Sequence, residues 1–130
     1  MDEALAMTLQ HLRQREQFGV AIGSFQSLRH RVADMFIALE QAKSMAILAN
    51  LRCCREDAGE RAKAASAAKI QIGSAGRFIG QQAIQLHGAI GMSDEYKVGH
   101  LFKRLTIIDK MFGDVPYHIE RLNQRGGILA

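Results

Sequence analysis

Apolar side chains recur every three or four residues over an unusually long stretch of this chain. The stretch contains Phe25, Leu28, Val32, Met35, Phe36, Leu39, Ala42 and Ala46. This spacing lines up one face of an α-helix. Ser24 is a suitable N-cap, and the pattern continues to about Asp57, so we predict a helix of about 33 residues, roughly 50 Å long. Such a helix needs neighbours along its whole length, from this chain or from another.

Three further long helices and a short one are predicted from similar evidence. Leu5, Leu9 and Leu12 are spaced by four and three residues, and the alanine-rich segment AKAASAAK is a strong helix former. Pro116 suits the first turn of the short terminal helix. No segment predicts a β-strand. The predicted helices cover about residues 2–17, 24–57, 60–86, 95–111 and 116–123.

We therefore expect an all-α fold, an antiparallel four-helix bundle with a short extra C-terminal helix, in which residues 1–130 form one domain. Gly73, Gly76 and Gly80 lie inside the third long helix, where each costs up to about 1 kcal/mol relative to alanine. Their presence predicts the close approach of another helix or of a ligand. At the end of this helix, Gly88 is expected in the left-handed conformation.

Composition excludes several classes of protein. The chain is 48% hydrophobic and 23% charged, with a formal net charge of +4, which is typical of a folded globular domain. It has no apolar run long enough for a membrane span and no basic start of a secretory signal. The adjacent Cys53 and Cys54 predict reduced thiols and a cytoplasmic location. The histidines show no metal-ligand spacing, so we expect no metal site.

Arginines gather around the first predicted loop, at positions 13, 15, 29 and 31. The planar guanidinium can bind two oxygens of a phosphate at once. Nucleic-acid binding would need basic residues interleaved with aromatic ones along one face, and that pattern is missing. Two interpretations remain open for this cluster, a solvated surface and an anion site.

Two sequence blocks resemble the C-terminal helical domain of acyl-CoA dehydrogenases. The first is REQFG at residues 15–19, followed by FQ at 25–26 and ADM at 33–35. The second is AIQLHGAIG at residues 83–91, followed by EY at 95–96 and by Leu101 and Arg104. The blocks keep the order of the family, and the resemblance spans about residues 2–122.

The resemblance implies a bundle that packs into a dimer or tetramer, with FAD lying between subunits. Arg15 and Phe18 match positions that hold the pyrophosphate and adenosine end of the neighbouring subunit's flavin, and Gln17 lies between them. Gln85 and Gly88 match positions beside the partner's FAD. Ala89 replaces the usual second glycine of the second block. We expect assembly mainly through the helices over residues 60–86 and 95–111.

The family catalyses α,β-dehydrogenation of acyl-CoA thioesters, in which a carboxylate removes the α-proton and the flavin accepts a hydride. The position of the usual catalytic glutamate falls on Gly113, which cannot take a proton. Asp114 is one residue away. It either caps the short helix or acts as the base after a one-residue shift with a raised pKa. Tyr117 stands where a flavin-contacting polar residue often lies.

Two hypotheses about function follow from the resemblance. In the first, the chain is the C-terminal domain of an FAD-dependent acyl-CoA dehydrogenase, an oxidoreductase of fatty-acid metabolism, and supplies flavin contacts and the core of a homo- or hetero-oligomer. In the second, it is a catalytically silent assembly subunit or remnant that acts through helix association. The family's N-terminal helical and central β domains are absent from the chain, which predicts a fragment of a longer flavoprotein or a stand-alone remnant.

Overall fold

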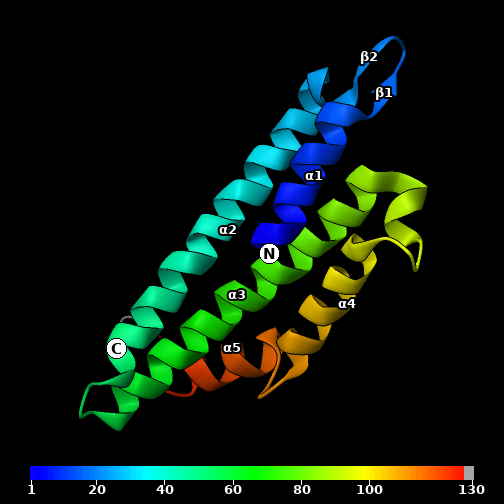
Figure 1. Cartoon of the computed structure of the whole chain (residues 1–130). Coiled ribbons are helices and arrows are strands. Elements are labelled where there is room, and N and C mark those ends of the chain that lie inside the picture. Colours follow the sequence, from blue (N-terminus) through cyan, green and yellow to red (C-terminus); the bar gives the residue numbers. More distant parts are fainter. Residues whose placement is uncertain (128–130) are drawn as a thin grey trace.

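The computed structural model describes residues 1–127 and is almost entirely helical (Figure 1). This confirms the all-α bundle with its short extra helix. The long elements are α1 (Asp2–Gln14), α2 (Gln26–Cys53), α3 (Ala58–His87), α4 (Lys97–Lys110) and the shorter α5 (Val115–Asn123). The connecting elements are β1 (Glu16–Gln17), β2 (Val20–Ala21) and the 3₁₀ turns η1 (Ile22–Ser24) and η2 (Gly88–Met92).

Helix α3 is the centre of the fold. It runs beside α2 over most of its length, and it also contacts α1, α4 and α5 (Figure 1). The core therefore lies between α3 and the helices that surround it. The buried core residues are Ala4, Leu5, Leu12, Met35, Leu39, Ile79, Ala83, Leu86 and Val98.

Both ends of α2 differ from the prediction. Ser24 belongs to η1 and donates its hydroxyl to Ala21 O at 2.7 Å, so α2 begins only at Gln26 without a side-chain cap. The helix ends at Cys53, because Asp57 caps the next helix instead. Its carboxylate accepts hydrogen bonds from the backbone N–H groups of Gly59 and Glu60, at 2.6 and 3.4 Å. An N-cap residue has a non-helical backbone conformation, so Asp57 cannot cap α3 and also belong to α2.

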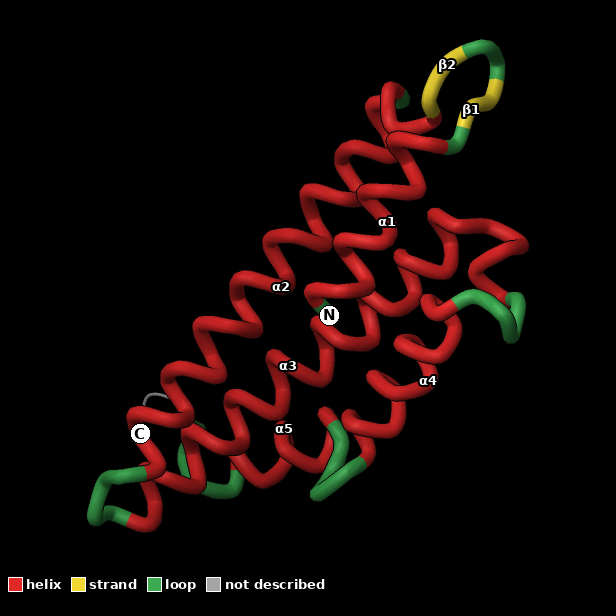
Figure 2. Tube along the Cα trace, viewed as in Figure 1, coloured by secondary structure: helices red, strands yellow, loops and turns green. Residues whose placement is uncertain are grey.

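A β-hairpin joins α1 to α2, although no strand was predicted. Glu16 pairs with Ala21 and Gln17 with Val20, and Figure 2 shows the hairpin projecting from one end of the bundle. Strands of two residues are too short to give an alternating apolar pattern. Positive φ angles at Phe18 (56°) and Gly19 make a two-residue turn of the kind that suits a hairpin.

The glycines inside α3 face α4, which confirms the close approach of another helix. A Cβ at Gly76 would lie 3.6 Å from Leu105, and a Cβ at Gly80 would meet the ring of Phe102. At Gly73 the added carbon would clash with the buried carboxylate of Asp109. The glycines therefore set the distance between α3 and α4.

Large apolar side chains remain exposed on elements other than α3. One group lies on α2 and consists of Phe36, Ile37, Ile47, Leu48 and Leu51. A second group follows α4 into α5 and consists of Ile107, Ile108, Met111, Phe112, Tyr117 and Ile119. Four helices of its own chain contact α3, and the two exposed apolar groups lie on helices α2, α4 and α5 that surround it and on the segment that joins α4 to α5. None of the described helices is long and apolar enough to cross a membrane.

Candidate functional site

The hairpin carries the first group of predicted flavin-contact residues. Arg15 ends α1, with its N–H bonded to His11 O at 2.8 Å and its carbonyl accepting from Ile22 N at 2.8 Å. Its guanidinium is exposed and has no carboxylate partner among the described residues. Gln17 is exposed as well. The backbone at Arg15 is therefore fixed while its charged end is free to bind an anion.

Phe18 occupies the tip of the hairpin and is 90% exposed. Its φ of 56° belongs to the left-handed region, which costs a non-glycine residue roughly 1–2 kcal/mol. The favoured residue at this turn position is asparagine, aspartate or glycine. The rings of Phe18 and Phe25 meet edge-on, with centroids 6.2 Å apart. A bulky apolar side chain that is both strained and exposed is typical of a functional position.

The end of α3 carries the second group, Gln85 and Gly88, both exposed. Gly88 has the expected positive φ, 64°, but its ψ of −142° lies outside the left-handed helical region. This backbone conformation is close to one that essentially only glycine adopts. No atom lies within 4 Å of the position a Cβ would take. The N–H of Gly88 is already bonded to the carbonyls of Ile84 and Gln85. A ligand could therefore approach the exposed backbone of Gly88 closely, but it would find no free N–H donor there.

Stacked rings bring the two groups together at one end of the bundle. His11 lies on α1 one turn before Arg15, and its ring stacks on that of His87 with centroids 4.5 Å apart. The buried His87 donates from Nδ1 to Ala83 O at 2.8 Å, and its ring also contacts Tyr96 at 5.2 Å. Sequence reasoning missed this cluster. The one available signal was that each histidine lies within four residues of a predicted flavin contact.

The environment of His11 favours its neutral form. Partial burial is the main cause that lowers its pKa, followed by the electrostatic effects of the neighbouring His87 and Arg15. Arg15 keeps its positive charge at this end of the bundle even with His11 uncharged.

The loop between α4 and α5 carries the position expected for a catalytic base. Gly113 has φ 98°, and a Cβ there would clash with the ring of Tyr117. Phe112 also has a positive φ, 61°, and is 88% exposed. Gly113 is therefore required by the backbone, and a larger residue with a carboxylate does not fit this loop conformation.

Polar side chains of α3 and α5 fix this loop. His118 donates from Nε2 to Phe112 O at 3.1 Å, and its Nδ1 lies 3.2 Å from the hydroxyl of Ser66. Lys69 donates to three carbonyls at the end of α4, those of Ile108, Asp109 and Met111, at 2.9–3.2 Å. Neither anchor was predicted, because Lys69 lies 42 residues from Met111, and Ser66, which positions His118, lies 52 residues from it.

Asp114 caps α5 as one of its two predicted roles requires. One carboxylate oxygen accepts from Tyr117 N at 3.2 Å, and the other accepts from the ammonium of Lys110 at 2.7 Å. The hydrogen bond from Lys110, followed by that from the Tyr117 N–H, lowers the pKa of Asp114. A catalytic base active near neutral pH needs a pKa shifted in the opposite direction.

The predicted residues thus form two separate sites. Arg15, Gln17, Phe18, Gln85 and Gly88 lie at the hairpin end. Gly113 and Asp114 belong to the segment between α4 and α5, which contacts the N-terminal half of α3 at Ser66 and Lys69. Figure 1 shows this segment away from the hairpin. Along α3, Ser66 and Gly88 are separated by about 33 Å at 1.5 Å per residue. The two sites of one chain lie too far apart to surround one small ligand.

Comparison with known proteins gives the family. Residues 1–126 match the family model described as acyl-CoA dehydrogenase, C-terminal domain. The chain belongs to the acyl-CoA dehydrogenase family. The family match covers nearly the whole of this acyl-CoA dehydrogenase domain, so the resemblance recognised from the two sequence blocks is confirmed.

Individual relatives agree with this assignment. Acyl-CoA dehydrogenase IpdE2 of Mycobacterium tuberculosis is 34% identical over 103 residues, which are 79% of this chain and 30% of that protein. A variant of the Tcur3481-Tcur3483 steroid ACAD is similar with a TM-score of 0.90 and 28% identity, over 95% of this chain and 34% of that one. The FAD complex of PigA has a TM-score of 0.87 and 26% identity, over 99% and 33%. The domain spans about a third of each of these proteins.

Proposed function

We propose that this domain acts within an FAD-dependent acyl-CoA dehydrogenase and supplies flavin contacts from its hairpin end. The observation that carries the proposal is Phe18, which is exposed and strained at the tip of the hairpin. PigA, which has a similar fold, is known as an FAD complex. An exposed aromatic ring beside an unpaired guanidinium suits the adenosine and pyrophosphate of a dinucleotide.

The residues present fit the flavin. The guanidinium of Arg15 would pair with pyrophosphate oxygens, and the ring of Phe18 would form an apolar wall next to the adenosine. Gln17 and Gln85 would donate or accept hydrogen bonds at the edge of the site. At Gly88 the open space and the lack of a side chain would let the cofactor approach the backbone closely.

When bound, FAD would supply a hydride acceptor for the β-carbon of an acyl-CoA thioester. The residues of this domain hold and orient the cofactor and do not remove the α-proton, since Gly113 has no carboxylate and Asp114 is engaged as a helix cap. The base would come from another part of the polypeptide or from a partner subunit. The distance between the hairpin end and the Gly113 loop further supports an arrangement in which the two sites serve different flavins.

We also propose that the domain forms the core of a dimer, a tetramer or a hetero-oligomer. The exposed apolar groups on α2 and on α4–α5 support this, because a monomer would leave them in water. The family match favours this oligomeric flavoprotein over a silent assembly remnant. A cytoplasmic location remains a prediction, supported by the two free, exposed thiols of Cys53 and Cys54.

The proposal is tested on the native protein by separating flavin binding from folding. Replacing Phe18 by asparagine, a residue favoured at this turn, relieves backbone strain and removes the aromatic wall. We expect an unchanged or higher Tm together with a loss of bound flavin, measured by absorbance after gel filtration. In Arg15→Ala we expect weaker FAD retention, because a charge-assisted hydrogen bond is worth about 1.5–3 kcal/mol.

The control is Gly19→Ala, which introduces strain at φ 78° without removing a flavin contact. It should lower Tm, and any flavin it loses should follow the loss of folded protein. Full flavin retention in both Phe18→Asn and Arg15→Ala would show that the hairpin does not bind the cofactor.

A further inference from the structure

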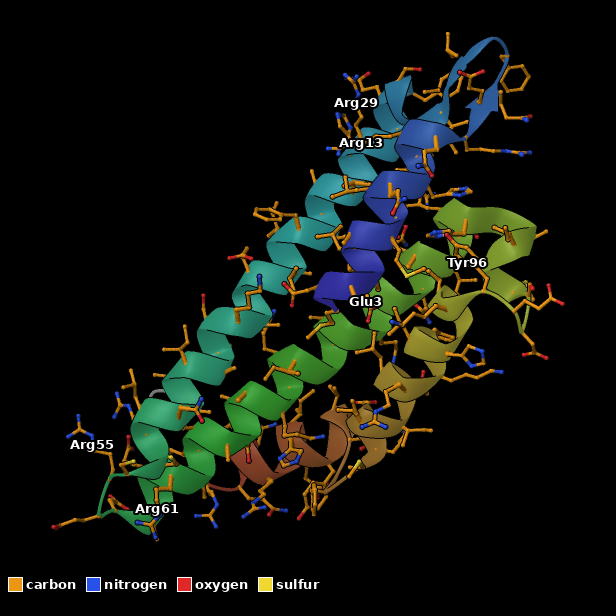
Figure 3. The ribbon with its side chains drawn as sticks, viewed as in Figure 1. Glu3, Arg13, Arg29, Arg55, Arg61 and Tyr96 are labelled. Carbon is orange, nitrogen blue, oxygen red and sulfur yellow. The ribbon has the colours of Figure 1, made fainter. Side chains whose placement is uncertain are left out.

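A cavity lies between the hairpin, α1 and α2, and the proposed flavin site uses none of its lining residues. Its volume is about 470 Å³, within the range of small-molecule sites. It is lined by the apolar residues Leu9, Leu12, Ala21 and Val32, together with Gly23 and Ser24. Arg13 of α1 and Arg29 of α2 stand at its edge, and Figure 3 shows these two labelled side chains at the same end of the bundle.

The two guanidiniums lack any negative partner. Neither Arg13 nor Arg29 forms an ion pair with a carboxylate of residues 1–127, and no acidic residue lines the cavity. Like charges held at one cavity repel each other unless an anion lies between them. The unpaired charge at this cavity therefore favours a bound anion.

One of the guanidiniums is held in place by the fold. The Nε of Arg29 donates to Gly23 O at 2.9 Å, which leaves its terminal N–H groups for another acceptor. The turn that supplies this carbonyl is itself fixed, since Phe25 N bonds Ile22 O at 3.1 Å and the hydroxyl of Ser24 bonds Ala21 O at 2.7 Å. The geometry thus presents Arg29 to the cavity without much loss of side-chain freedom on binding.

The structure divides the four arginines of the first loop between different roles. Arg15 belongs to the hairpin end with Phe18, and Arg31 donates to the Gln82 side chain at 3.0 Å. Arg13 and Arg29 remain, and they meet at a cavity with apolar walls. Two positive charges match the charge of a phosphate monoester, which is close to −2 at neutral pH.

We propose that this cavity binds a phosphate monoester that carries an apolar group. The phosphate pairs with Arg13 and Arg29, whose planar forks each bind two oxygens. The apolar group is covered by Leu9, Leu12 and Val32. The site is separate from the proposed flavin contacts, and none of its lining residues belongs to the group Arg15, Gln17, Phe18, Gln85 and Gly88.

The test is calorimetric titration of the native, flavin-loaded protein with phenyl phosphate and, separately, with inorganic phosphate. We expect phenyl phosphate to bind at least tenfold more tightly, because inorganic phosphate leaves the apolar walls in water. Binding should weaken at high salt. In Arg13→Gln, whose side chain has no other described contact, phenyl phosphate affinity should fall at least tenfold with Tm and bound flavin unchanged.

The matched control is Arg104→Gln, an exposed arginine of α4 outside the cavity, which should leave affinity unchanged. Equal affinities for phenyl phosphate and inorganic phosphate would show that the apolar walls contribute nothing to binding, and this result would overturn the proposal. The same conclusion follows if Arg13→Gln binds normally, or if Arg104→Gln weakens binding as much. Release of flavin by phenyl phosphate would place the anion at the flavin site instead, which also contradicts the proposal.

Discussion

Two hydrogen bonds hold the Asp114 carboxylate in its ionised form at the start of α5, one from Lys110 and one from Tyr117 N–H. Asparagine can still cap a helix, so Asp114→Asn should leave Tm and acyl-CoA turnover of the native enzyme nearly unchanged. Asp114→Ala removes the cap and should lower Tm by about 2–6 °C, measured by calorimetry. A hundredfold loss of turnover in Asp114→Asn, with flavin and Tm retained, would instead identify Asp114 as the base.

The stack of His11 on His87 makes stability depend on pH. The pKa of His11 is lower in the folded chain than in the unfolded one, so the unfolded state binds more protons as the pH falls below about 6.5. The stabilising contribution of His11 is therefore complete above that pH and decreases on acidification. We expect Tm to fall between pH 7.5 and 5.5 in the native protein.

The change His11→Phe keeps an aromatic ring but cannot titrate. Its Tm should vary less over the same pH range than that of the unchanged protein. The lowered pKa values of Asp2 and Asp114 act only at more acidic pH, below about 4, and do not contribute in this window. Identical pH profiles for the two proteins would rule out His11 as the source of the effect.

At the scale of elements, α3 and α4 approach closely because of the glycine face of α3. In Gly73→Ala the new methyl group would clash with the carboxylate of Asp109, which Arg77 already holds at 2.9 Å, and with Val115. Overpacking of this kind costs about 1–3 kcal/mol. We expect this loss in the free energy of unfolding, measured with denaturant.

Gly76 provides the matched control on the same face of α3. An alanine Cβ there meets Leu105 only at an ordinary contact distance of 3.6 Å. Since alanine is the better helix former, Gly76→Ala should be neutral or stabilise by up to about 1 kcal/mol. Equal losses in the two variants would contradict this steric explanation, because a Cβ has ordinary contact distances at Gly76 and clashes only at Gly73.

At the scale of the whole molecule, the exposed apolar group of α2 indicates a face that is covered in the assembled protein. Ile47 and Leu51 are one turn apart and are 61% and 68% exposed. A double change to glutamate puts two charges in that face, so we expect a smaller oligomer by sedimentation equilibrium with helical content unchanged. Gln10→Glu, on the exposed side of α1, should keep the native mass. An unchanged mass in the double variant would exclude this face from the interface.

Much of the fold and part of the site were predictable from the sequence. The order and approximate extent of the helices follow from the spacing of apolar residues, which is a local property. The cap formed by Asp114 and the glycine at position 88 were predicted for the same reason, since both depend on neighbours within four residues. The family was recognisable because residues 15–19 and 83–91 are continuous segments, and the comparison with relatives confirms it.

Only the tertiary structure decided how these parts meet. Local spacing marks the apolar face of a helix but not the neighbour that covers it, so the central position of α3 could not be predicted. The stack of His11 on His87 and the contact of His118 with Ser66 join residues that are distant in the sequence and meet only when the helices pack. In the same way, Arg13 and Arg15 are only two residues apart in the sequence, but in the folded chain Arg13 lines the cavity and Arg15 does not.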